Sequence, residues 1–185
     1  MSKIQVIPKH ILNQLPKCMD EEWMAFATEN MWWASMNIGS LQKFTEVFSA
    51  GTPEEHALFF ALHKKLLSFG GCETCFPEID EDVKRILERG YLRNGTSKLM
   101  RGQPCRCHSN VCNLWEQNHA EHDVRICTGY ALSDDGMWRS HTWMLHVYDT
   151  ATQRREQVIE TTEKRIAYFG FEMTDAEAEV FCYAN

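Results

Sequence analysis

The sequence has no dense stripe of Lys and Arg residues. Its formal net charge is −7, with 19 basic residues against 26 acidic ones. Nucleic acids and anionic membranes bind proteins largely through clustered positive charge. We therefore expect neither as a partner.

Long apolar runs are also absent. The first residues, MSKIQVIPKHILNQLPKC, lack an uninterrupted apolar core followed by a small-residue cleavage site. No later segment approaches the length that crosses a bilayer, and we see no internal repeat. The 185 residues, 44% of them apolar, match one ordinary domain. We expect a soluble, cytoplasmic protein; the sequence does not indicate an oligomeric state.

The chain contains eight cysteines. In a small secreted protein this number would suggest disulfides. Without a secretion signal, reduced thiols, metal ligation or catalysis are the more probable uses in a cytoplasmic chain.

The periodicity of apolar residues changes near residue 100. Before that point Thr52 and Pro53 predict the start of a helix that ends at Gly70, and 80–90 and 20–36 also have helical spacing. After Cys107 the period falls to two, which predicts strands over 124–132, 140–149 and 156–162, joined as an antiparallel hairpin with a third strand added. Thr174 is a good cap for a final helix.

These patterns predict an α+β fold. We expect a helical N-terminal region over 1–100, packed on a core over 101–185 in which a helix lies against an antiparallel sheet.

The stretch CRCHSNVCNLWEQN, residues 105–118, opens the predicted core helix. Helical spacing places Cys107, Val111, Leu114 and Asn118 in one stripe, with Cys107 at the N-terminus. Free N–H groups and the positive end of the helix dipole favour a thiolate there and can stabilise an oxyanion. Cys107 is therefore the candidate nucleophile.

A thiolate nucleophile needs a histidine base. On the 140–149 strand His141 and His146 point to opposite faces, and His141 stands at the strand's start, where a cleft could open. Glu160 is a carboxylate inside the apolar run VIETT, so it needs a partner such as the second ring nitrogen of His141. The predicted set is Cys107 as nucleophile, His141 as base and Glu160 as the acid that orients it. Taken singly, each residue has an ordinary structural interpretation.

The motifs CHSNV, TGYALSDDG, SHTWML, VIETT and RIAYFGFEM, over about 103–173, occur in an order that resembles a papain-like cysteine hydrolase family of small bacterial and phage proteins. The resemblance implies a papain-like core, a protein or peptide substrate, no cofactor, and the cytoplasm of a bacterium or a phage-infected host. It assigns the same roles to Cys107, His141 and Glu160.

Three features depart from that family. Glu160 stands where Asp is commoner, and Thr142 where Ala is usual. The family's oxyanion glutamine has only a weak counterpart in Gln103, which is closer to Cys107 than usual. The backbone N–H of Cys107 is the safer oxyanion donor.

A zinc site is the alternative. Cys72 and Cys75 form a C-x-x-C pair that Cys105 with Cys107 or His108 could complete, although C-x-C is not the spacing of a standard zinc ribbon. That set would make the chain a non-catalytic, zinc-stapled binding protein. The leading hypothesis is a thiol hydrolase or acyl-transfer enzyme acting on an amide bond, of peptidase, amidase or glutamine deamidase type.

Overall fold

The computed structural model describes residues 52–75, 81–94 and 96–185, and the predicted helix over 20–36 lies outside them. Leu58–Asn185 forms one compact unit. The α+β class is confirmed for the described residues. Its helices are α4 (Pro53–Ser68), α5 (Glu81–Arg89), α6 (Cys107–Asn118) and α7 (Asp175–Ala184). Its strands are β1 (Glu73–Thr74), β2 (Tyr91–Asn94), β3 (Lys98–Leu99), β4 (Asp123–Leu132), β5 (Met137–Asp149), β6 (Arg154–Glu160) and β7 (Ala167–Glu172).

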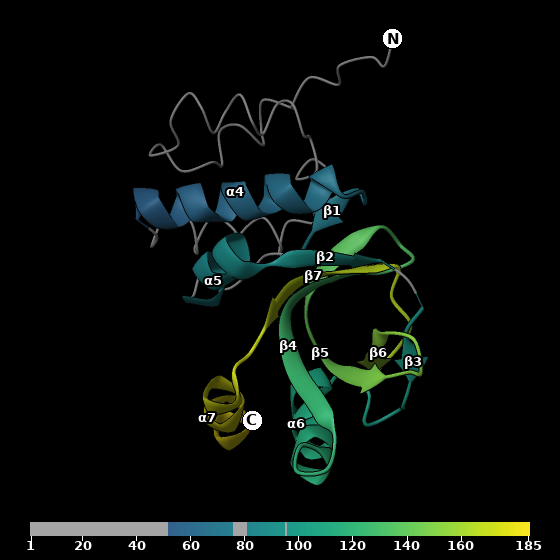
Figure 1. Cartoon of the computed structure of the whole chain (residues 1–185). Coiled ribbons are helices and arrows are strands. Elements are labelled where there is room, and N and C mark those ends of the chain that lie inside the picture. Colours follow the sequence, from purple (N-terminus) through teal and green to yellow (C-terminus); the bar gives the residue numbers. More distant parts are fainter. Residues whose placement is uncertain (1–51, 76–80, 95) are drawn as a thin grey trace, which may run out of the picture. The chain divides into compact units, whose positions relative to one another are not determined.

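The strands form one curled sheet in the order β2-β7-β4-β5-β6-β3, with β1 paired to β5 (Figure 1). The predicted hairpin is confirmed, since β4 and β5 pair antiparallel with Gly129 opposite His141. The third predicted strand, β6, pairs antiparallel with β5. β3 joins β6 in parallel and forms the end of the strand order.

The stretch before residue 100 is not only helical. The predicted helices at 53–69 and 80–90 are confirmed as α4 and α5, but β1 lies between them, and β2 and β3 follow α5. These strands are two to four residues long, so they lack the alternation that marks a strand in a sequence. They become strands only by pairing with β5, β7 and β6.

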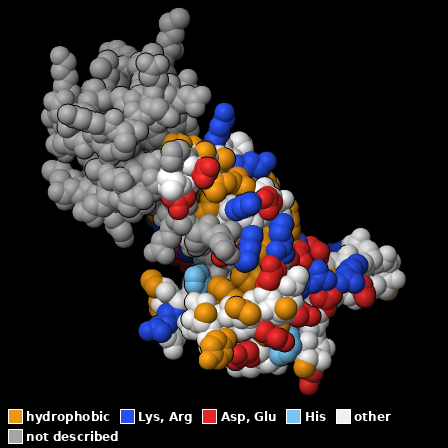
Figure 2. Space-filling view, turned by 90° about the vertical axis from the view of Figure 1, so that its left-hand side faces the viewer, with side chains coloured by type: hydrophobic (Ala, Val, Ile, Leu, Met, Phe, Trp, Pro, Cys, Tyr) orange, Lys and Arg blue, Asp and Glu red, His pale blue; other side chains and the backbone are white. Residues whose placement is uncertain are grey.

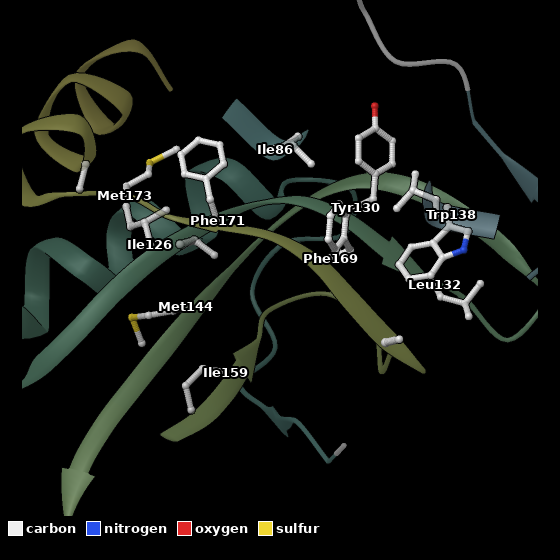
Figure 3. Packing of buried hydrophobic residues seen from close by; sticks show 14 of the residues in the cluster. Ile86, Ile126, Tyr130, Leu132, Trp138, Met144, Ile159, Phe169, Phe171 and Met173 are labelled. Carbon is white, nitrogen blue, oxygen red and sulfur yellow. The ribbon is translucent and has the colours of Figure 1, made fainter. Parts of the chain in front are cut away.

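Alternation along the strands separates two apolar clusters. Met144, Ile126, Ile159 and Phe171 belong to the larger cluster (Figure 3). The same cluster receives apolar residues from all four helices, among them Leu62, Ile86, Val111, Trp115 and Ala178. The second cluster contains the odd-numbered β5 residues Trp143, Leu145 and Val147, together with Cys127 and Ala131 of β4 and Tyr168 of β7. The two faces predicted for β5 are therefore both buried.

The helix ends follow the predicted capping chemistry. Thr52 and Glu55 exchange side-chain hydrogen bonds with each other's backbone N–H at 3.3 and 2.6 Å. Thr174 and Glu177 form the same capping box at the start of α7. α7 packs against α6, and the thiols of Cys112 and Cys182 interact between the two helices.

Among the described residues no helix is both long and apolar enough to cross a bilayer. On the face shown in Figure 2, Lys and Arg side chains are interspersed with Asp and Glu. Opposite charges are also paired at Arg125, which lies 3.0 Å from Asp123 and 2.7 Å from Glu172. This face therefore carries mixed charge rather than a field of one sign.

Two glycines let β7 approach β4 beside His141. Gly170 is paired with Gly129, and Gly129 is paired with His141 on the next strand. A Cβ on Gly170 would lie 2.1 Å from the carbonyl oxygen of Thr128 and 2.8 Å from the Trp143 ring. The first of these atoms is backbone, so the strands would have to separate.

We expect Gly170→Ala to lower the free energy of unfolding by about 1–3 kcal/mol through overpacking. Ser140→Ala, at an exposed position on β5, is the control and should change it by less than about 0.5 kcal/mol. Urea denaturation followed by circular dichroism measures both. Equal stability of the two variants would show that β4 and β7 are not held at this separation.

Candidate functional site

The first turn of α6 presents free backbone N–H groups. The chain enters the helix through Cys105 in a left-handed conformation (φ 56°), and Arg106 provides no side-chain cap. Within the described residues, the N–H groups of Cys107, His108 and Ser109 have no hydrogen-bond acceptor. Together with the helix dipole, they make the surroundings of Cys107 favourable for negative charge.

His141 on β5 lies against Glu160 at the end of β6. Nε2 of His141 is 2.9 and 3.1 Å from the two carboxylate oxygens. The side chains of His141 and Glu160 are 3% and 0% exposed. Because Nε2 is engaged by Glu160, Nδ1 is the ring nitrogen left for Cys107, whose thiol is hydrogen-bonded to His141. The three residues predicted to converge are therefore brought together.

Glu160 is surrounded by hydrogen-bond donors besides His141. Its Oε1 accepts from the backbone N–H of Thr161 at 2.8 Å, and from the N–H and hydroxyl of Thr162 at 2.9 and 3.0 Å. Its Oε2 accepts from the Tyr168 hydroxyl at 3.1 Å. Burial alone would raise the pKa of Glu160, but the bonds from His141 and Thr162 hold it below its ordinary value. The group is therefore a carboxylate at neutral pH.

Hydrogen bonds to the Cys107 thiol outweigh its burial. Burial acts to raise its pKa, whereas hydrogen bonds from His108, from His141 and from the backbone N–H of Thr142 lower it, to about 5. Burial likewise acts to lower the pKa of His141, but its bonds to Cys107 and Glu160 raise it above the ordinary value of 6.5. Between about pH 5 and 6.5 the pair is thus a thiolate beside an imidazolium.

Sequence reasoning missed the contact between His108 and Cys107. The sequence suggests His108 only as an alternative metal ligand, yet its bond to Cys107 raises its pKa against the effect of burial. Its ring packs edge-on against Phe181 of α7, with centroids 5.3 Å apart. Adjacency to Cys107 was the only signal in the sequence, and it does not indicate which way a ring turns.

Asn110 binds the segment that precedes α6. Its Oδ1 accepts from the Gln103 backbone N–H at 2.9 Å, and its Nδ2 donates to the Gln103 carbonyl at 2.8 Å. The Gln103 side chain is exposed, and its suggested role toward an oxyanion stays a prediction. A Cβ on Gly102 would lie 2.4 Å from Cγ of Asn110, so a glycine is needed for this close approach.

The alternative zinc ligands are not assembled. Over the parts of the chain that the structure describes, no three His, Cys, Asp or Glu side chains are placed to hold one metal ion. Cys72, Cys75, Cys105 and His108 all lie within those parts. The Cys72 thiol instead donates to the carbonyl of Gly136 at 3.4 Å, and Cys105 is exposed.

Comparisons with protein-family models, with curated proteins and with solved structures found no match. The family resemblance carried by the sequence motifs therefore stays a prediction, and the geometry of the three residues is the evidence on function.

The first prediction from this site concerns Cys107 alkylation. We expect the rate with iodoacetamide to reach half its maximum near pH 5, the pH at which the thiol ionises. Cys182 is the internal control, because burial and Cys112 raise its pKa to about 12. In His141→Gln the Cys107 midpoint should move upward. Peptide mapping by mass spectrometry gives the rates, and a Cys107 midpoint no lower than those of the other thiols would contradict the thiolate assignment.

The second prediction concerns the stability that Glu160 provides. Glu160→Ala leaves buried donors and His141 without their acceptor, so the free energy of unfolding should fall by about 3–5 kcal/mol near pH 6. The folded-state pKa of Glu160 is lowered, so its contribution exists above the ordinary 4.5 and is lost as the pH falls through the folded value. The gap in unfolding free energy between wild type and variant should therefore narrow as the pH falls below 4.5 and through the folded-state pKa.

Glu163→Gln is the matched control, since Glu163 is 67% exposed in its ion pair with Arg165. It should leave the free energy of unfolding within about 1 kcal/mol of wild type in urea titrations. A pH-independent gap for Glu160→Ala would mean that Glu160 is already protonated in the folded protein.

Proposed function

We propose that this chain is a thiol-dependent hydrolase or acyl-transfer enzyme that acts on an amide bond of a protein or peptide, through a papain-like core. The observation that carries the proposal is the buried His141, bonded through Nε2 to Glu160 and hydrogen-bonded to the thiol of Cys107. A carboxylate that holds an imidazole against a thiol at a helix N-terminus is the arrangement of a cysteine nucleophile.

In the proposed reaction the Cys107 thiolate attacks the carbonyl carbon of the amide, forming a C–S bond. The negative charge moves to the carbonyl oxygen, where the unpaired N–H groups at the start of α6 can stabilise it. The His141 imidazolium then gives its proton to the departing nitrogen as the C–N bond breaks. An amine leaves, and a thioester on Cys107 remains.

The thioester is resolved by a second nucleophile. His141, now neutral, removes a proton from water or from an amine, which attacks the thioester carbon and releases Cys107. Glu160 keeps Nε2 protonated throughout and stabilises the charge on the ring. Water on a main-chain amide gives peptidase activity, water on a side-chain amide gives deamidation, and an amine gives transamidation.

A small activated ester tests the acyl transfer step directly. With p-nitrophenyl acetate near pH 6, we expect p-nitrophenolate release and an acetyl group on Cys107, seen by peptide mapping. Cys107→Ala should abolish the acetylation, and His141→Gln should slow it by at least about a hundredfold.

Cys105→Ala is the control for a neighbouring thiol, because Cys105 is exposed and lies outside the His141 contact. It should keep the wild-type rate. Acetylation spread evenly over the cysteines, or release that survives in Cys107→Ala, would overturn the proposal.

A further inference from the structure

The segment before α6 is held on one side by the strand that carries Glu160. β3 pairs in parallel with β6, with Leu99 opposite Glu160. Beyond β3 the N–H of Met100 donates to the Glu160 carbonyl and that of Gly102 to the Thr161 carbonyl, each at 2.8 Å. The even-numbered residues of this segment therefore direct their main-chain groups toward β6.

The odd-numbered residues direct theirs the other way. In an extended segment, main-chain groups alternate between its two edges. The N–H and carbonyl of Gln103 bind Asn110, so the odd-numbered main-chain groups face α6. For Leu99 and Arg101, neither the outward N–H nor the outward carbonyl has a partner in the described ranges 52–75, 81–94 and 96–185. We name this unpaired side, residues 99–101, the outer edge.

A pocket of about 510 Å³ lies between the segment and α6. Residues 100–103 line one wall, and Asn110, Asn113 and Leu114 line the other. Asn110 is one helical turn from Cys107, so the pocket begins close to the nucleophile. Arg101 is the one charged residue in this lining, which favours an uncharged or acidic group over a basic one.

We propose that the outer edge is the substrate-binding site, and that it takes an extended peptide as an added strand. This rests on the proposed function and names the class of its substrate. Leu99 and Arg101 offer two N–H groups and two carbonyls at the two-residue spacing of a strand, which a peptide main chain complements. Side chains of the added strand alternate between its two faces, so one that points toward the pocket then enters it.

The outer edge is fixed before any peptide arrives. β6 binds one side of the segment, and Asn110 binds Gln103 with two hydrogen bonds. The close approach of Gly102 to Asn110 leaves no room for even a methyl group. A preformed edge lowers the entropy lost on binding, and a lone small amide could not pair with both Leu99 and Arg101.

Vinyl sulfone probes that alkylate Cys107 test this. We expect acetyl-Ala-Ala-Ala-Gln vinyl sulfone to react at least about tenfold faster than acetyl-Gln vinyl sulfone. Two further probes carry N-methyl groups, one on the central alanine and the other on the two flanking alanines. Only alternate N–H groups of an added strand face the outer edge. One N-methylated probe should therefore react as slowly as acetyl-Gln vinyl sulfone, and the other as fast as the unmethylated tetrapeptide.

Two variants test whether the main-chain N–H of Arg101 binds the peptide probe. Arg101→Pro removes the outward N–H and should slow the tetrapeptide probe by about tenfold relative to Arg101→Ala, which also loses the charged side chain but keeps that N–H. Iodoacetamide alkylation of Cys107 should be equal in both. If Arg101→Pro fails to fold, the pair of N-methylated probes still decides.

Failure here is distinguishable from failure of the proposed function. Equal rates for the long and short probes, or equal losses with both N-methylated probes, would overturn strand addition while p-nitrophenyl acetate still acetylates Cys107. Loss of that acetylation together with ordinary alkylation kinetics would instead overturn the catalytic proposal.

Discussion

The structure around the site depends on one buried negative charge. Glu160 has no exposed surface, and a carboxylate in that position is tolerable only because donors surround it. Those donors come from β5, from the turn after β6 and from β7, through His141, Thr162 and Tyr168. The hydrogen bonds to Glu160 therefore fix the relative positions of three parts of the sheet. They also hold the His141 imidazole in the position from which it contacts Cys107.

Much of the core could be predicted because its signals are local. The alternation of β4, β5 and β6 and the capping residues of α4 and α7 act within a few positions, and α6 begins at Cys107 as expected. His141 and Glu160 could be paired because a carboxylate in an apolar strand needs a partner. β2, β3 and the contacts of His108 and Asn110 depend on segments distant in the sequence or on main-chain groups, neither of which leaves a residue pattern.

The segment 98–103 links Cys107 to Glu160. β3 pairs with the end of β6, and Gln103 is bound by Asn110 one turn into the helix that Cys107 begins. A displacement of α6 would strain the bonds of Asn110 to Gln103, and a displacement of β6 would strain those of Met100 and Gly102. The distance between Cys107 and Glu160 is thus controlled through backbone hydrogen bonds as well as through His141.

The low pKa of Cys107 has a cost in chemical durability. Peroxides oxidise thiolates far faster than thiols, so the ionised sulfur of Cys107 is the one most readily converted to a sulfenic acid. Burial raises the pKa of Cys127 and Cys182, which keeps those sulfurs in the inert protonated form. In air the Cys107 sulfur would therefore be oxidised while the fold stayed intact. A well-folded preparation can then consist of chains whose Cys107 no longer reacts.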